Sequence, residues 1–153
     1  MNVKPTDMPI EPIKELNIQT KIGEIKFSDF QLEKSVITDS KINVEHFQYE
    51  FNVNMGVNMP KNEINVNLNI NMFSDLEKKN KVGYINSHGI FIVFNLTEII
   101  KQSEGKIPNI VFANFIGVLI STTRGFLIDK SQGTPIEGAM IPIVNPLTFF
   151  PNK

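Results

Sequence analysis

Two consecutive segments of strict alternation constrain the fold of this chain more than any other feature. An apolar side chain stands at every second position from 47 to 59, and the same period returns from 64 to 72 with asparagine at each position between. A period of two predicts a β-strand with one buried and one solvated face. The connection at 60–62 is short, so we expect the two strands to be antiparallel neighbours.

Further strands are predicted on both sides of this pair. The stretch 27–44 predicts one strand with a bulge or bend near Val36 and Ile37, where the alternation changes phase. After a charged turn, 82–94 predicts a fourth strand with a bulge at 87–89. The end of that strand is apolar on both faces, which predicts that both faces are covered.

Two helices follow in the sequence. Residues 96–104 predict a short helix with Thr97 as its N-cap. A longer helix opens at Pro108 and is expected to end at Arg124-Gly125, and its nearly all-round hydrophobicity predicts burial on all sides. The predicted fold class is therefore α+β: a four-stranded antiparallel meander with one long and one short helix.

Composition bounds the remaining possibilities. The chain has 153 residues, which fits a weakly ordered N-terminal arm over 1–22 and one domain over 23–153. The absence of cysteine excludes disulfides and thiolate chemistry. A net charge of -1 argues against nucleic-acid partners and against binding to an anionic membrane. The first residues lack the apolar core of a signal peptide, and the apolar stretch near 107–120 looks too short to span a bilayer, so we expect a cytoplasmic protein.

The sequence offers little for catalysis. It contains no phosphate-binding, nucleophile-elbow or zinc-protease motif, and His46 and His88 do not have the spacing of metal ligands. An enzyme or small-ligand carrier would have only Tyr84, His88 and Arg124 as distant candidates. We therefore expect no enzyme, no catalytic residue, no cofactor and no metal.

The chain carries more apolar surface than a small sheet and one helix can bury. The two-sided fourth strand, the long helix and the apolar stretch at 147–151 make up this excess. Contiguous exposed apolar patches mark partner surfaces. The partner is either another copy of the chain or a different polypeptide, and self-association is compatible with binding another polypeptide.

Several strings of residues resemble the SecB export chaperone family. They are 30–39 (FQLEKSVITD), 89–91 (GIF), 108–112 (PNIVF), 124–126 (RGF) and 141–145 (IPIVN), in that order over about 28–149. The resemblance implies an ATP-independent holdase that binds unfolded or precursor polypeptides in protein export. It also implies dimers that associate as a homotetramer.

On this resemblance, candidate sites are assigned by residue. The client-binding groove would be lined by Tyr84, Ile85, Phe91, Phe112, Phe115, Met140 and Ile141. The oligomer interface would use Phe30, Leu32, Ile116, Leu119 and Ile120.

The chain also departs from the family pattern. Asp39 matches one acid of the patch that docks the translocase motor ATPase, but the other matching positions are the uncharged Asn43 and Tyr84. The family's second helix and polar tail are replaced by the apolar stretch 146–151. The alternative is therefore a dedicated partner-binding protein, such as a SecB-like chaperone of a toxin–antitoxin pair, that is not coupled to the motor.

Overall fold

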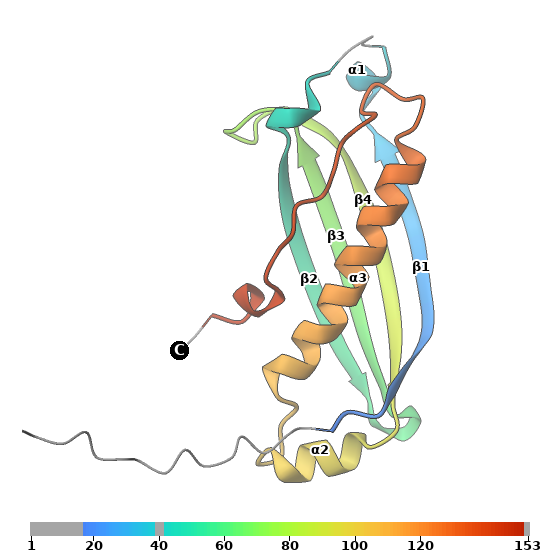
Figure 1. The fold of residues 1–153 in the computed structure, drawn as a ribbon, viewed down its shortest axis with the longest axis vertical. Coiled ribbons are helices and arrows are strands. Elements are labelled where there is room, and N and C mark those ends of the chain that lie inside the picture. The colour runs from blue at the N-terminus through green and yellow to red at the C-terminus, as the bar shows by residue number, and fades with distance from the viewer. Residues whose placement is uncertain (1–16, 39–41, 152–153) are drawn as a thin grey trace, which may run out of the picture.

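The computed structural model describes residues 17–38 and 42–151 of the chain. Over these ranges the protein is α+β, with one four-stranded antiparallel sheet and a long helix, α3, packed on one of its faces (Figure 1). The elements, in chain order, are β1 (Thr20–Leu32), α1 (Lys34–Ile37), η1 (Val44–His46), β2 (Gln48–Asn58), η2 (Met59–Lys61), β3 (Glu63–Phe73), β4 (Lys81–Val93), α2 (Leu96–Gln102), α3 (Asn109–Lys130) and η3 (Pro146–Phe149).

The two alternating segments form the hairpin predicted from the sequence. β2 and β3 pair antiparallel without a register shift, from Gln48 opposite Phe73 to Asn58 opposite Glu63. The turn between them ends at Asn62, which adopts a left-handed φ of 53°. Asparagine tolerates this conformation because its short side chain hydrogen-bonds locally.

The strand order corrects the predicted meander at one strand. Strands β2, β3 and β4 form a meander, but β1 lies beyond β4, so the order across the sheet is β1-β4-β3-β2. This is a Greek-key arrangement. It is reached because the connection that contains α1 and η1 separates β1, at one edge of the sheet, from β2, at the other edge.

The predicted strand over 27–44 is wrong in its extent. β1 begins at Thr20 and ends at Leu32, and the phase change near Val36 marks the single helical turn of α1, where Val36 is buried. Most of the predicted N-terminal arm lies outside the described residues, and residues 20–22 belong to β1.

The predicted bulge at 87–89 is also wrong. β4 pairs continuously with β3 through this stretch, and the irregularity lies in the opposing β1, between Phe27 and Asp29. Packing against the Phe91 ring favours glycine at position 89, because a Cβ there would lie 2.7 Å from Cε2 of Phe91.

The helices also differ from prediction at their ends. α2 takes Asn95 as its N-cap, two residues earlier than the predicted Thr97. α3 continues past Arg124-Gly125 to Lys130, because Leu127 is fully buried and Phe126 stacks on Phe27 of β1 with ring centroids 4.0 Å apart.

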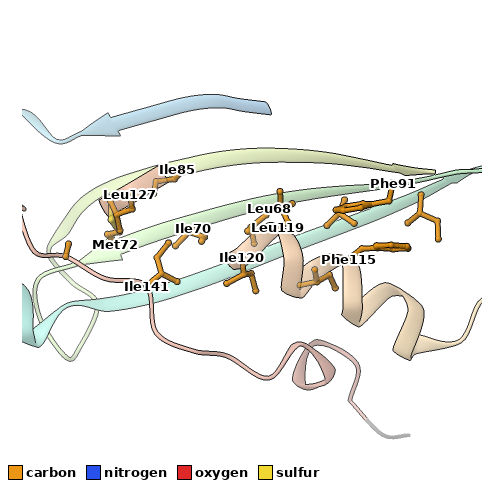
Figure 2. Close-up of a cluster of buried hydrophobic side chains, with 14 of the residues drawn as sticks. Leu68, Ile70, Met72, Ile85, Phe91, Phe115, Leu119, Ile120, Leu127 and Ile141 are labelled. Atoms are coloured by element: carbon orange, nitrogen blue, oxygen red, sulfur yellow. The ribbon is translucent and has the colours of Figure 1, made fainter. Parts of the chain in front are cut away.

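The core lies between α3 and the sheet (Figure 2). It includes a stacked pair, Phe91 of β4 and Phe115 of α3, with centroids 4.5 Å apart. α3 extends beyond the apolar stretch 107–120 to Lys130, and by length and composition alone this longer helix is apolar enough to cross a membrane. Its inner face is nevertheless packed against β3 and β4, as in the core helix of a globular domain.

A buried polar contact fixes α3 on the sheet. The Thr123 hydroxyl donates to the Leu119 carbonyl (2.7 Å), so it is free to accept from the Ser87 hydroxyl of β4 (3.0 Å). Both side chains are nearly inaccessible, and both are satisfied by this arrangement.

The predicted burial of α3 on all sides does not occur within one chain. Ile110, Val118 and Ile128 on its outer face are 38–46% exposed. The far face of β4 is likewise only partly buried at Ile90 and Ile92. The excess apolar surface expected from the sequence is therefore present on a single copy.

Candidate binding surface

The inward face of β2 is only partly covered, although its neighbour β3 is completely covered. Val57 is 40% exposed, while Ile64, its partner across the pair, is 0% exposed. The difference arises because α3 packs over β3 and β4 and leaves the β2 edge to the C-terminal segment (Figure 1). Five inward residues of β2 are left partly open, and we call the last four of them the β2 strip; they are Phe51, Val53, Met55 and Val57.

The C-terminal segment returns along α3 on the β2 side of the sheet (Figure 1). Its first part is firmly held, because Ile141 is buried and Arg124 of α3 donates to the backbone carbonyls of Ile141 (2.7 Å) and Pro142 (2.8 Å). A guanidinium offers several donors in a fixed fork, which suits two successive carbonyls.

The segment ends in an aromatic turn, which we define as Pro146–Phe150. The Phe149 ring lies against Phe51 of the β2 strip with centroids 6.1 Å apart. The Phe150 ring lies against Phe112 of α3 at 6.3 Å. The aromatic turn therefore bridges the β2 strip and the helix.

Between its two attached ends the segment stands away from α3. A hollow of about 530 Å³ lies between them, with Ser121 and Thr122 of α3 on one side and Ile143 and Val144 on the other. Ile143, in the middle of this stretch, is 93% exposed. The segment is thus held at both ends and loosely packed in between.

Tyr49 lies in the same row of β2 as the strip. Its hydroxyl is buried and has no hydrogen-bond partner among the residues the structure describes. Burial raises the pKa of Tyr49 to about 12, and the nearby Met140 backbone lowers that pKa by a smaller amount without a well-formed hydrogen bond.

The opposite face of the sheet is polar, and amide side chains on it hydrogen-bond to one another. Asn52 donates to Asn69 (3.2 Å), which donates to Asn86 (2.7 Å), and this amide row runs across three strands. In the next row the His88 ring nitrogen Nδ1 lies 2.6 Å from the Asn67 side-chain oxygen. A shallow hollow of about 350 Å³ on this face is lined largely by such amides. The sheet therefore has one apolar and one amide face.

Of the residues predicted to bind clients, most lie inside the core. Ile85, Phe91, Phe115 and Ile141 are at most 4% exposed (Figure 2). They pack against one another within the chain and present no surface in this conformation.

The other three predicted client contacts lie apart from each other. Tyr84 is on the amide face, where it donates to Asp29 (2.7 Å), and this hydrogen bond raises the pKa of Tyr84. Met140 is 58% exposed at the start of the C-terminal segment. Phe112 alone lies beside the aromatic turn.

The residues predicted for an oligomer interface also divide into buried and partly buried groups. Ile116, Leu119 and Ile120 are buried under the sheet, whereas Phe30 and Leu32 of β1 are partly buried against the core. Asp39, the predicted contact for the translocase motor, lies outside the described residues.

The β2 strip, Phe149 and Phe150 are not among the site residues predicted from the sequence. Two signals pointed toward them: the uninterrupted alternation of β2 and the surplus apolar residues after Pro146. Within residues 17–38 and 42–151, no group of three or more histidine or acidic side chains is arranged to hold a metal ion.

Comparisons with known proteins address the fold. No protein-family model matches the sequence, and no curated protein matches it. Among solved structures, the chain is similar to the Mycobacterium tuberculosis Rv1957 SecB-like chaperone, solved in complex with a ChAD peptide from the Rv1956 HigA1 antitoxin. The TM-score is 0.50 at 10% identity, over 82% of this chain and 90% of the other. The SecB-like fold implied by the sequence resemblance is confirmed.

Proposed function

We propose that the protein is an ATP-independent chaperone that holds extended apolar segments of non-native polypeptides on the β2 strip. The observation that carries this proposal is the half-open inward face of β2, where Val57 is 40% exposed beside the fully buried inward face of β3. Alternate strand residues stand about 6.6–6.8 Å apart. This spacing matches alternate side chains of an extended client.

The residue types of the strip fit a binding site of low specificity. Met55 is flexible and polarisable, and Phe51 offers a broad apolar ring, so both adapt to varied client side chains. Many weak contacts would add along a client, so affinity should rise with client length.

Association of several copies is part of the proposal. The outer face of α3 leaves Val118 and Ile128 open to solvent, and β1 forms a free edge of the sheet among the described strands. Both are surfaces that a second copy could cover, and leaving one large apolar side chain open forgoes roughly 1.5–3 kcal/mol. We propose a homodimer or homotetramer that keeps the β2 strip accessible.

The test is suppression of aggregation of an unrelated unfolded protein without ATP. Wild type should suppress aggregation at a stoichiometric ratio, and the double variant Val53→Ser/Met55→Ser should lose most of this activity. The matched control is Asn52→Ser/Asn54→Ser, on the opposite face of the same strand, which should retain it. No suppression by wild type would refute the proposal.

A second candidate function is recognition of one dedicated partner. It is favoured by the solved neighbour, whose structure holds a peptide from an antitoxin. A panel of unrelated unfolded proteins distinguishes the two functions by competition for the strip. If the protein is a holdase, every unfolded protein in the panel should displace a bound client from the strip at a similar concentration. If it is dedicated to one partner, none of them should displace that partner.

Two narrower predictions accompany the proposal. We place the protein in the cytoplasm, and we regard coupling to a translocase motor as dependent on Asp39 alone among the family's matching acids. Motor binding by wild type that is lost in Asp39→Asn would support this dependence, and the absence of motor binding by wild type would refute the coupling.

A further inference from the structure

The distal part of the C-terminal segment is attached by side chains and not by its backbone. Its backbone hydrogen bonds are local, from Thr148 to the Asn145 carbonyl (3.0 Å) and from Phe150 to the Leu147 carbonyl (3.1 Å). Over the described part of the chain, no backbone hydrogen bond joins residues 143–150 to the sheet or to α3. Release of the aromatic turn would therefore break no hydrogen-bond ladder.

The contacts that do hold the turn are of the kind a client would make. Phe149 and Phe150 use Phe51 of the β2 strip and Phe112 of α3, the partly covered aromatic side chains at this site. The proximal end is fixed independently, through Arg124 and the buried Ile141. The loosely packed stretch around Ile143 separates the fixed end from the releasable one.

We propose that the aromatic turn is a built-in competitor that occupies the client site and leaves it when a client binds. This inference rests on the proposed function and specifies the regulation of the same site. Because the turn is tethered, its effective concentration at the strip is high, on the order of millimolar for a short linker. Only a client that offers several apolar contacts at once displaces it.

The occupant also identifies the chemistry that the site prefers. Its sequence, Pro-Leu-Thr-Phe-Phe-Pro over 146–151, places two adjacent aromatic side chains after a proline-led turn. One ring contacts the strand and the next contacts the helix. The preferred ligand is therefore a short peptide segment with two consecutive aromatic residues, and single aliphatic residues should bind less well.

The first test uses a fluorescent peptide with the sequence of residues 144–151 as the probe. The full chain with Phe149→Ala/Phe150→Ala has a vacated site and should bind this peptide about 10–100-fold more tightly than wild type, because the competing closed state is removed. The matched control is Leu147→Ala/Thr148→Ala, which alters two exposed residues of the same turn and should bind as wild type does. Equal binding by wild type and the double phenylalanine variant would overturn the inference.

A second test locks the turn in place. The chain has no cysteine, and a Cβ at Gly117 would lie 3.2 Å from Cγ of Pro146. These positions are within reach of a disulfide in Gly117→Cys/Pro146→Cys. The oxidised form should lose peptide binding and the reduced form should regain it, whereas identical binding in both forms would contradict the inference.

An unfolded protein client separates this inference from the proposed function. If neither wild type nor the double phenylalanine variant binds the client, both proposals fail. If both bind it equally well, the chaperone function stands and the competitor role of the turn is refuted. Tighter client binding by the variant supports both.

Discussion

β2 and β3 show how far the same sequence pattern can lead to different environments. Both strands are 11 residues long, alternate strictly, and pair residue for residue in one register. Every inward residue of β3 is at most 2% exposed, whereas the inward residues of β2 are partly open. Alternation therefore specifies which face turns inward, but the position of α3 determines how completely that face is covered.

The difference has a functional meaning in this fold. The central strand is covered by a helix that is fixed by a buried hydrogen bond between Ser87 and Thr123. The edge strand is covered by an extended segment that depends on aromatic contacts at its end. Stability is concentrated on β3 and β4, and exchangeable contacts are concentrated on β2.

The largest predicted effect compares the two strands directly. Leu68→Ala should lower the free energy of unfolding by about 3 kcal/mol, because it leaves a cavity in a fully buried site. Val53→Ala, its partner on β2, should cost about 1 kcal/mol or less, since its surroundings are partly open. Denaturant unfolding measures both, and equal losses would contradict the distinction between the strands.

A smaller effect tests the polar contact that fixes α3. Thr123→Ala should cost about 1–2 kcal/mol, because Ser87 is then left buried without its acceptor. Thr122→Ala is a close control, since Thr122 also donates to the carbonyl four residues earlier but is exposed. Thermal unfolding should show a clear loss for the first variant only; similar losses for both would mean that the buried contact contributes nothing.

The pH dependence tests the edge strand. The pKa of Tyr49 is raised by burial from 10.0 to about 12, so the folded state holds the proton more tightly than the unfolded state. The contribution of protonated Tyr49 to the free energy of unfolding is complete below pH 10 and is lost as the pH rises from 10 toward 12. After allowance for partial screening, the loss should be on the order of 1 kcal/mol at pH 11.

Tyr49→Phe removes this titration. The variant should match or slightly exceed wild-type stability at pH 7, since it removes a buried hydroxyl that has no hydrogen-bond partner in the described part of the chain. Chemical unfolding at pH 7 and pH 11 measures the difference. A wild type that loses no more stability than Tyr49→Phe over this range would show that the hydroxyl is not buried.

The smallest effect concerns the amide face. Asn69→Ala interrupts the row between Asn52 and Asn86, but Asn52 is exposed and the other two positions are only half-buried, so it should cost about 0.5 kcal/mol or less. It should leave client binding unchanged. Loss of client binding in this variant would indicate that clients bind on the amide face of the sheet and not on the β2 strip.

The fold was largely predictable because its strongest signals are local. The alternation fixed the β2–β3 pair, and the helical periodicity after Pro108 located α3. The strand order was not predictable in this way, because the pairing of β1 with β4 is a contact between residues far apart in the sequence. The continuation of α3 past Gly125 similarly depends on the contact of Phe126 with Phe27.

The candidate site was harder to predict, for a related reason. The family resemblance indicated the apolar residues Phe91, Phe115 and Ile141 as client contacts, but their hydrophobicity also suits a core position, and the structure buries all three. Which apolar residues remain accessible depends on which strand becomes an edge. That is decided by tertiary packing, so Val57 could not be distinguished from Ile64 by sequence pattern alone.

The most direct test of the account is methyl NMR of the full chain with a permanently unfolded client and no nucleotide. The methyl groups of Val53, Met55 and Val57 report on the β2 strip, and those of Ile90 and Ile92 report on the opposite face of the sheet. The account predicts shift changes at the strip methyls and little change at the two isoleucines. Changes confined to Ile90 and Ile92, or no changes at all, would contradict it.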